Sequence, residues 1–283
     1  MQLGDFTLTT ICGGRFRIDG GTMFGVVPKA IWNRVCPADE KNNIPQTTNC
    51  LLVQSQDRTV LIDTGYGSKL TDKARRRLGA DEGDPLLESL QSAEVKPTDI
   101  DTVILTHLHF DHAGGCTRYD EAGQVVPAFP NAEYIVQQQE WTTAAAQCAE
   151  LAAAYPTEHF LPLEHTGQLR LIEGDTEILP GIRSHVTGGH TEAHQILYIE
   201  SRSQTAVYLA DLCPTSHHLP TSWCMSYDVN VLQTRRMKRR VLGETADGGW
   251  LALFDHDPTH AAGRLERTKG GEFVLGEGVQ GRP

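Results

Sequence analysis

The stretch Thr106-His-Leu-His-Phe-Asp-His-Ala-Gly-Gly115 places four side chains that can bind metal ions within six residues: His107, His109, Asp111 and His112. A buried strand is predicted for the five residues before it, Asp-Thr-Val-Ile-Leu. The first two histidines are two positions apart, so they leave the same face of an extended backbone. The other two ligands follow where the chain turns, and they can approach a second centre. Imidazoles and a carboxylate suit Zn²⁺, Fe²⁺ or Mn²⁺, and four close ligands are more than one catalytic ion usually takes.

Three further residues with metal-binding side chains each follow a β-rich run: His190, Asp211 and His256. The first lies in Thr-Gly-Gly-His, the second in Tyr-Leu-Ala-Asp, and the third in Leu-Phe-Asp-His. Functional residues of α/β proteins often gather in the loops beyond strand ends. Taken singly, each of these residues would more often be structural than functional, so their order along the chain carries the argument.

That order, His-x-His-x-Asp-His followed by His, Asp and His, resembles the metallo-β-lactamase superfamily from about residue 50 to residue 257. The resemblance implies an α/β protein with an αββα sandwich, in which two mixed sheets are flanked by helices. It also implies two divalent metal ions, with zinc favoured and Mn, Fe or Co as alternatives. One ion would be held by His107, His109 and His190, the other by Asp111, His112 and His256, with Asp211 bridging both.

Two other residues recur in the motifs of that superfamily. Asp63 ends a predicted strand in Leu-Ile-Asp-Thr-Gly, and it would hold the ligand loop by hydrogen bonds rather than bind metal. The alternative is an aspartate that only caps the turn. His194, four residues after His190, is interpreted as a supporting or structural histidine.

A binuclear centre of this kind predicts hydrolysis by a metal-bridging hydroxide, because two Lewis acids lower the pKa of water. Asp111 and Asp211 are the expected catalytic carboxylates, and Asp111 could pass a proton to the leaving alkoxide. The favoured substrate is a lactone or a carboxylic ester. A phosphotriester is the second hypothesis and a glyoxalase-II-like thioester the third.

The subclass rests on departures from related patterns. The bridging Asp211 argues against a true β-lactamase, and residues 1–46, before the Asp-Thr-Gly hairpin, are similar to the group of N-acyl-homoserine lactonases and organophosphate hydrolases. Those lactonases often carry a tyrosine shortly after the bridging aspartate. Here none follows, and Tyr227 or Tyr66 is the available substitute. A di-iron redox protein would need a flavin domain, a sulfur dioxygenase would need fewer ligands, and a non-enzymatic metal-binding protein would be expected to have a damaged ligand set.

Composition limits the partners. The net charge is −11, from 25 basic and 36 acidic residues, which argues against nucleic acid or an anionic membrane surface. The basic run at 235–240 is interpreted as a solvated helix face. Seven scattered cysteines without a Cys-x-x-Cys motif favour a reducing, cytoplasmic setting. No signal peptide or membrane span is expected. The expected partner is a small-molecule ester or lactone, and a homodimer is a further hypothesis.

A single domain over 1–283 is expected, with an N-terminal extension that forms a pocket loop at 1–46 and a C-terminal hairpin at 262–283. Further hairpins are predicted between the glycine pairs at 13–14 and 20–21, at 49–63, and around Gly174. Helices are predicted near 68–79, 85–94, 138–154 and 228–245. The proposed wall of the substrate pocket consists of four aromatic residues, Phe24, Trp32, Trp223 and Tyr227.

Overall fold

The computed structural model describes residues 1–280, and the chain separates into two compact units, each described here by itself. Unit 1 comprises Met1–Arg15 and Thr48–Thr176; unit 2 comprises Phe16–Thr47 and the chain from Glu177 onward. The long strands β2 and β3 contribute residues to both units. The expectation of a single domain stays a prediction.

Unit 1 contains a seven-stranded mixed sheet in the order β1-β2-β3-β4-β5-β8-β9. The pairs β4–β5, β5–β8 and β8–β9 are parallel, whereas β3 and β4 form the antiparallel hairpin that the sequence predicts. The strands are β1 (Gln2–Leu3), β2 (Phe6–Asp19), β3 (Asn43–Gln54), β4 (Thr59–Ile62), β5 (Thr102–Ile104), β8 (Glu133–Gln137) and β9 (Leu169–Ile172), with β6 (Thr117–Tyr119) and β7 (Val125–Pro127) in a separate ribbon.

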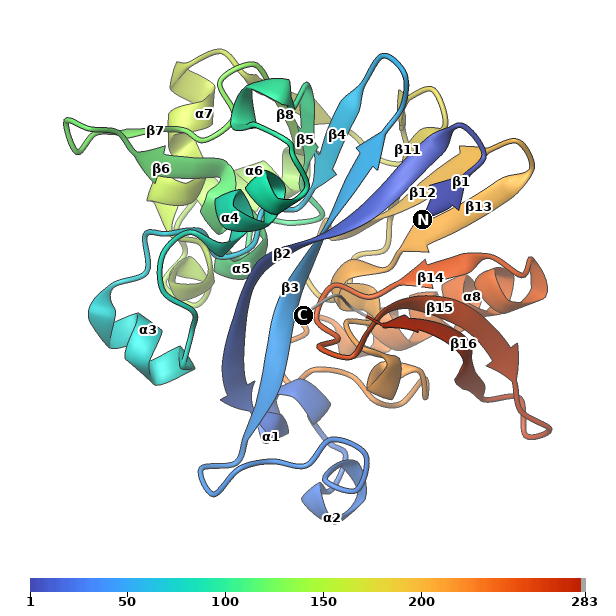
Figure 1. Ribbon diagram of the computed structural model, residues 1–283. Coiled ribbons are helices and arrows are strands. Elements are labelled where there is room, and N and C mark those ends of the chain that lie inside the picture. The colour runs from blue at the N-terminus through green and yellow to red at the C-terminus, as the bar shows by residue number, and fades with distance from the viewer. Residues whose placement is uncertain (281–283) are drawn as a thin grey trace. The chain divides into compact units, whose positions relative to one another are not determined.

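Helices of unit 1 cover one face of this sheet (Figure 1). Leu86 and Leu90 of α4, Trp141 of α6 and Leu163 of α7 pack into the same buried cluster as strand residues such as Val103. Parallel strands that are covered on both faces have mainly apolar residues in their interior, as β5 has in Val103-Ile104 and β8 has in Tyr134-Ile-Val136. The helices are α3 (Asp72–Leu78), α4 (Pro85–Ser92), α5 (Phe110–Ala113), α6 (Gln138–Ala145) and α7 (Leu161–His165), with 3₁₀ turns at Pro97–Asp99, Gly114–Cys116, Ala152–Ala154 and Thr157–His159.

Unit 2 contains a second seven-stranded mixed sheet in the order β10-β11-β12-β13-β14-β15-β16. The neighbours β13 and β14 are parallel, whereas the other pairs in this order are antiparallel. The long helix α8 (Val231–Asp247) packs Val241 and Leu242 against this sheet (Figure 1). The strands are β10 (Glu177–Leu179), β11 (Ile182–Val186), β12 (Gln195–Ser201), β13 (Gln204–Tyr208), β14 (Leu251–Leu253), β15 (His260–Arg267) and β16 (Phe273–Gln280), with 3₁₀ turns at Ala210–Leu212 and Ser216–His218.

The N-terminal segment that was expected to form a pocket loop at 1–46 is partly helical. It forms α1 (Gly20–Phe24) and α2 (Lys29–Trp32) before β3 begins at Asn43. Its apolar side chains build a small core of their own within unit 2, where Trp32 is 1% exposed and packs with Met225.

Two hairpin predictions are wrong. Residues between the two glycine pairs continue as the single strand β2, because Gly14 serves close packing rather than a turn: a Cβ there would lie 2.2 Å from the ring of Tyr66. The runs around Gly174 also do not pair, since β9 joins β8 in unit 1 and β10 joins β11 in unit 2. The C-terminal hairpin is present as β15 and β16, and residues 281–283 of that prediction lie outside the described residues. Across residues 1–280, the structure has no helix with the length and apolar character that a bilayer crossing needs.

Candidate metal centre

In unit 1, three neighbouring parallel strands deliver polar side chains to one edge of the sheet. Asp63 follows β4, Thr106 follows β5, and Glu140 lies in α6 directly after β8. The carboxyl ends of parallel strands lie at the same edge, which is where ligands of α/β proteins collect. The His-x-His-x-Asp-His stretch begins at this edge, immediately after Thr106.

Asp63 holds that stretch from one side. This residue is 2% exposed, and its two carboxylate oxygens accept hydrogen bonds from the Thr106 amide (2.8 Å), the Thr106 hydroxyl (2.8 Å) and Nδ1 of His112 (2.9 Å). The backbone of Asp63 has φ of 58°, a left-handed conformation that aspartate tolerates better than most residues. Because Nδ1 of His112 donates to Asp63, Nε2 is the nitrogen that can accept a cation, and it lies 3.9 Å from Oδ1 of Asp111.

The hydroxyl of Thr106 extends this network to His107. Since the hydroxyl proton goes to Asp63, Nδ1 of His107 donates to the hydroxyl oxygen at 3.1 Å. Nε2 of His107 then lies 3.0 Å from Nδ1 of His109, and their ring centroids are 4.5 Å apart. The two adjacent imidazoles thus present ring nitrogens to one position, as their spacing in the sequence predicts.

A second buried carboxylate, that of Glu140, accepts a hydrogen bond from the backbone of the His-x-His-x-Asp-His stretch. Glu140 is 1% exposed, and its Oε1 accepts hydrogen bonds from the Leu108 amide at 3.0 Å and from the Tyr155 hydroxyl at 3.2 Å. The ring of Tyr155 lies 5.0 Å from that of His109. The carboxylates of Asp63 and Glu140 therefore hold the amides of residues 106 and 108. The sequence analysis missed Glu140, which reads locally as an ordinary helical glutamate.

Glu140→Ala is expected to lower the free energy of unfolding by about 2–4 kcal/mol, since it leaves two buried donors without their acceptor. Glu140→Gln, which keeps an acceptor for Leu108, should cost less. Urea unfolding of the metal-free protein measures both. Glu133→Ala is the control, because that side chain is 51% exposed and its ion pair with Arg170 is a surface pair. An equal loss in Glu133→Ala and Glu140→Ala would contradict the assignment.

The turn after the motif is held by a buried lysine. Lys69 is 7% exposed, and its Nζ donates to the carbonyl of Gly114 at 2.6 Å and to that of Thr117. Burial lowers the pKa of Lys69 to about 8. An ammonium group bonded to two carbonyls fixes the chain directly beyond the ligand residues.

Unit 2 brings its own polar residues to one edge. Strands β11, β13 and β14 run in the same direction, because β12 is antiparallel to both β11 and β13, and β13 is parallel to β14. His190, Asp211 and His256 follow the carboxyl ends of these three strands. Ala210 has φ of 46°, an unfavourable value for a residue with a Cβ, and it redirects the chain just before Asp211.

His190 lies between two carboxylates of unit 2. Its Nδ1 is 2.9 Å from Oδ1 of Asp228, and its Nε2 is 2.9 Å from Oδ2 of Asp211. Complete burial disfavours the imidazolium, yet Asp211 and Asp228 outweigh burial and raise the pKa of His190 to about 10 in the metal-free protein. A site that holds a proton this strongly is a site of strongly negative potential. The sequence analysis missed Asp228.

His256 has a similar arrangement. Its Nδ1 donates to the carbonyl of Thr47 at 2.8 Å, so Nε2 carries the lone pair of the neutral ring. Nε2 lies 3.4 Å from Oδ1 of Asp211 and 3.6 Å from Oδ2 of Asp255. Asp255 is 1% exposed. The sequence analysis did not single out Asp255, although it directly precedes His256.

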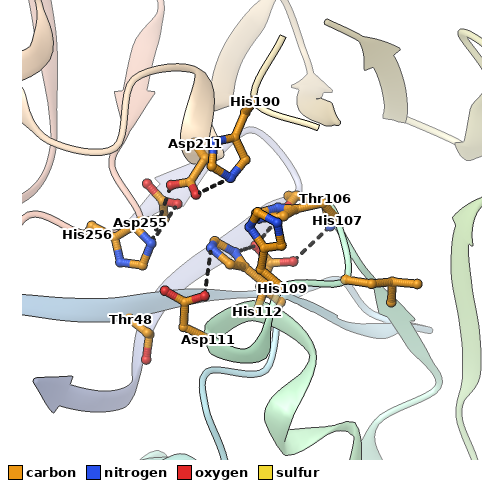
Figure 2. A network of polar contacts seen from close by, with 12 residues as sticks. Thr48, Thr106, His107, His109, Asp111, His112, His190, Asp211, Asp255 and His256 are labelled. Carbon is orange, nitrogen blue, oxygen red and sulfur yellow. Dashed lines mark hydrogen bonds and ion pairs between the residues drawn. The ribbon is translucent and has the colours of Figure 1, made fainter. Parts of the chain in front are cut away.

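Within each unit, these residues fit a divalent cation (Figure 2). Four histidines share one feature: Nδ1 donates to an oxygen of the same unit, so Nε2 is the ring nitrogen that could bind a cation. They are His107, His112, His190 and His256. In the last two, Nε2 faces the carboxylate of Asp211. An imidazole lone pair opposite a buried carboxylate is repulsive unless a proton or a metal ion lies between them.

Other histidines near the site have structural partners. Nδ1 of His194 is 2.7 Å from the hydroxyl of Thr187. His218 donates from Nε2 to the carbonyl of Met23 at 2.9 Å, accepts at Nδ1 from the hydroxyl of Thr215 at 2.7 Å, and stacks on Phe24. Burial lowers the pKa of His218 to about 3, so the ring is neutral and links Thr215 to Met23 within unit 2.

The four aromatic residues proposed for the pocket differ in exposure. Phe24 and Trp32 are each 1% exposed and stack on one another at 5.2 Å, while Tyr227 is 40% exposed with its ring 5.7 Å from that of His190. Trp223 packs edge-on against Phe24 at 5.5 Å. Tyr66, the other tyrosine considered, is buried in unit 1, where its hydroxyl donates to the carbonyl of Arg15 and accepts from the amide of Asp81.

These features define a class of α/β proteins with two mixed sheets flanked by helices and with histidine and aspartate ligands at strand ends. The sequence model of the metallo-beta-lactamase superfamily matches residues 44–269, and the chain belongs to that superfamily. The predictions of family and of fold class are therefore confirmed.

Two sequence relatives and one solved structure refine this placement. An N-acyl homoserine lactonase from Bacillus thuringiensis is 31% identical over 170 residues, which make up 56% of this chain and 61% of the relative. The chain thus spans about six tenths of that relative. The N-acyl homoserine lactonase AiiB from Agrobacterium fabrum is 37% identical over 238 residues, covering 77% of this chain and 82% of its own. A structure from Staphylococcus aureus, described as a "probable metal-dependent hydrolase", matches with 34% identity and a TM-score of 0.88 over 99% of this chain and 100% of its own.

Proposed function

We propose that this protein is a binuclear metal-dependent hydrolase of lactones or carboxylic esters. One observation carries the proposal: in His190 and His256, Nδ1 is bonded to an oxygen while Nε2 faces a buried aspartate, an arrangement that a divalent cation between the two groups would stabilise. Membership of the superfamily and the names of the lactonase relatives support the reaction class.

The ligand assignment follows the family resemblance. His107, His109 and His190 would hold one ion and Asp111, His112 and His256 the other, with Asp211 shared. Zinc is the favoured metal, and Mn, Fe or Co suit the same ligands. When bound, such ions polarise a substrate carbonyl and activate water near neutral pH.

The chain's own residues then have distinct roles. Asp63 and Asp228 orient His112 and His190 through Nδ1. The carboxylate of Asp111 is 14% exposed, and it could take a proton from the attacking water and pass it to the leaving alkoxide. The 40% exposure of Tyr227 and its ring contact with His190 support the proposal that this tyrosine would contact a substrate.

The activity is testable with a substrate panel in a pH-stat. Protein reloaded with zinc or manganese is expected to release acid from lactones of varied acyl length faster than from an aryl ester, a thioester or a phosphotriester. Removing metal with a chelator should abolish this release, and adding the ion back should restore it. Faster release from the phosphotriester would instead indicate an organophosphate hydrolase. Faster release from the thioester would indicate a glyoxalase-II-like thioesterase. Full activity in verified metal-free protein would refute the metal-dependent mechanism.

A further inference from the structure

Asp255 lies in unit 2 where β14 ends, one residue before His256. The chain here reads Leu253-Phe-Asp-His-Asp257, so two aspartates flank the histidine. Asp257 has a structural role, because its carboxylate accepts hydrogen bonds from the amide and hydroxyl of Ser216 and from the amides of Thr259 and His260. Asp255 is directed differently, toward His256 and Asp211.

The environment of Asp255 is one that favours a cation. One ligand atom of each of Asp211, Asp255 and His256 lies within 4.8 Å of the others. The three residues are at most 3% exposed. Nδ1 of His256 is committed to the carbonyl of Thr47, so the ring presents Nε2 to both carboxylates. Two carboxylates buried this close repel each other unless a positive charge lies among them.

We infer that Asp255 is an additional ligand of the divalent ion held by His256. The inference rests on the proposed binuclear function, and it adds a carboxylate to the set that the family resemblance implies. A further anionic oxygen makes the ligand set harder. Carboxylate oxygens suit Mn²⁺ better than imidazoles do. The site that contains Asp255 should therefore bind Mn²⁺ with an affinity closer to that for Zn²⁺ than the same site without Asp255 would.

The alternative is that Asp255 only neutralises a protonated His256, without any metal. The two explanations predict opposite effects of Asp255→Asn on the metal-free protein. If Asp255 is a metal ligand, removing its charge relieves repulsion with Asp211, so the melting temperature without metal should stay equal or rise. If it is an ion-pair partner, the same substitution should lower that temperature.

The experiment compares wild type, Asp255→Asn and the control Asp247→Asn, whose carboxylate is 66% exposed in a surface ion pair with Arg267. Each chelator-treated protein is titrated with Mn²⁺ and with Zn²⁺ against a chromophoric chelator, and the bound ions are counted. Asp255→Asn is expected to keep one site unchanged and to weaken the other at least about tenfold, with a larger loss for Mn²⁺ than for Zn²⁺. Metal should also raise its melting temperature less than it raises that of wild type.

The results distinguish the proposed function from the role of Asp255. A wild type that binds no metal would refute the proposed function itself. A wild type with two sites, together with unchanged affinities in Asp255→Asn, would refute only the role of Asp255. Loss of stability in the metal-free variant together with unchanged metal affinities would identify Asp255 as an ion-pair partner only, and would refute its role as a metal ligand. The control should match wild type in both affinities.

Discussion

Replacing Asp63 with alanine is expected to lower the free energy of unfolding of the metal-free protein by about 3–5 kcal/mol. The carboxylate is buried and accepts three hydrogen bonds, from the amide and hydroxyl of Thr106 and from Nδ1 of His112. Truncation leaves these buried donors without an acceptor. It also forces alanine into φ of 58°, which costs roughly a further 1–2 kcal/mol for a residue with a Cβ.

Chemical unfolding followed by circular dichroism measures this loss. Asp63→Asn should cost clearly less than alanine, because asparagine keeps a carbonyl acceptor and tolerates the left-handed conformation. Asp57→Ala, in the exposed turn between β3 and β4, is the control, with an expected change within about 0.5 kcal/mol. A loss below about 1 kcal/mol for Asp63→Ala would show that the carboxylate does not hold the ligand stretch.

Asp211→Asn is expected to reduce kcat on the best lactone or ester by about a thousandfold or more. Asp211 is the carboxylate that faces Nε2 of both His190 and His256. A Lewis-acid centre contributes several kcal/mol to transition-state stabilisation, and about 4 kcal/mol corresponds to roughly a thousandfold in rate. Asparagine has nearly the same shape as aspartate, so the change mainly removes charge.

Metal analysis and kinetics on the same samples test this prediction. Asp211→Asn should weaken the binding of both ions, whereas Asp255→Asn should weaken the binding of only one. This difference would identify Asp211 as the shared ligand. Asp247→Asn again serves as the exposed control of the same chemical change. Undiminished turnover in Asp211→Asn with full metal content would refute the assigned role of Asp211.

Local sequence patterns were sufficient to predict several strands, one hairpin and the candidate metal ligands. The β-rich runs in the sequence predicted β5, β8 and β11 almost to the residue, because β-branched and aromatic side chains favour an extended backbone. The hairpin of β3 and β4 was equally readable from two β-rich runs joined by a short polar turn. The candidate metal ligands could also be identified in the sequence, because their chemistry is rare at such spacing and each group follows a strand.

Only the tertiary structure decided how those side chains are supported. Glu140, Asp228 and Asp255 look like ordinary acidic residues along the chain, and their roles appear only when Leu108, His190 and His256 are seen beside them. The same holds for β9 and β10, which lie close enough in sequence to form a hairpin but pair in different sheets. A sequence specifies what each residue can bond, whereas the partner of a buried carboxylate depends on which distant segment the fold brings within hydrogen-bond distance.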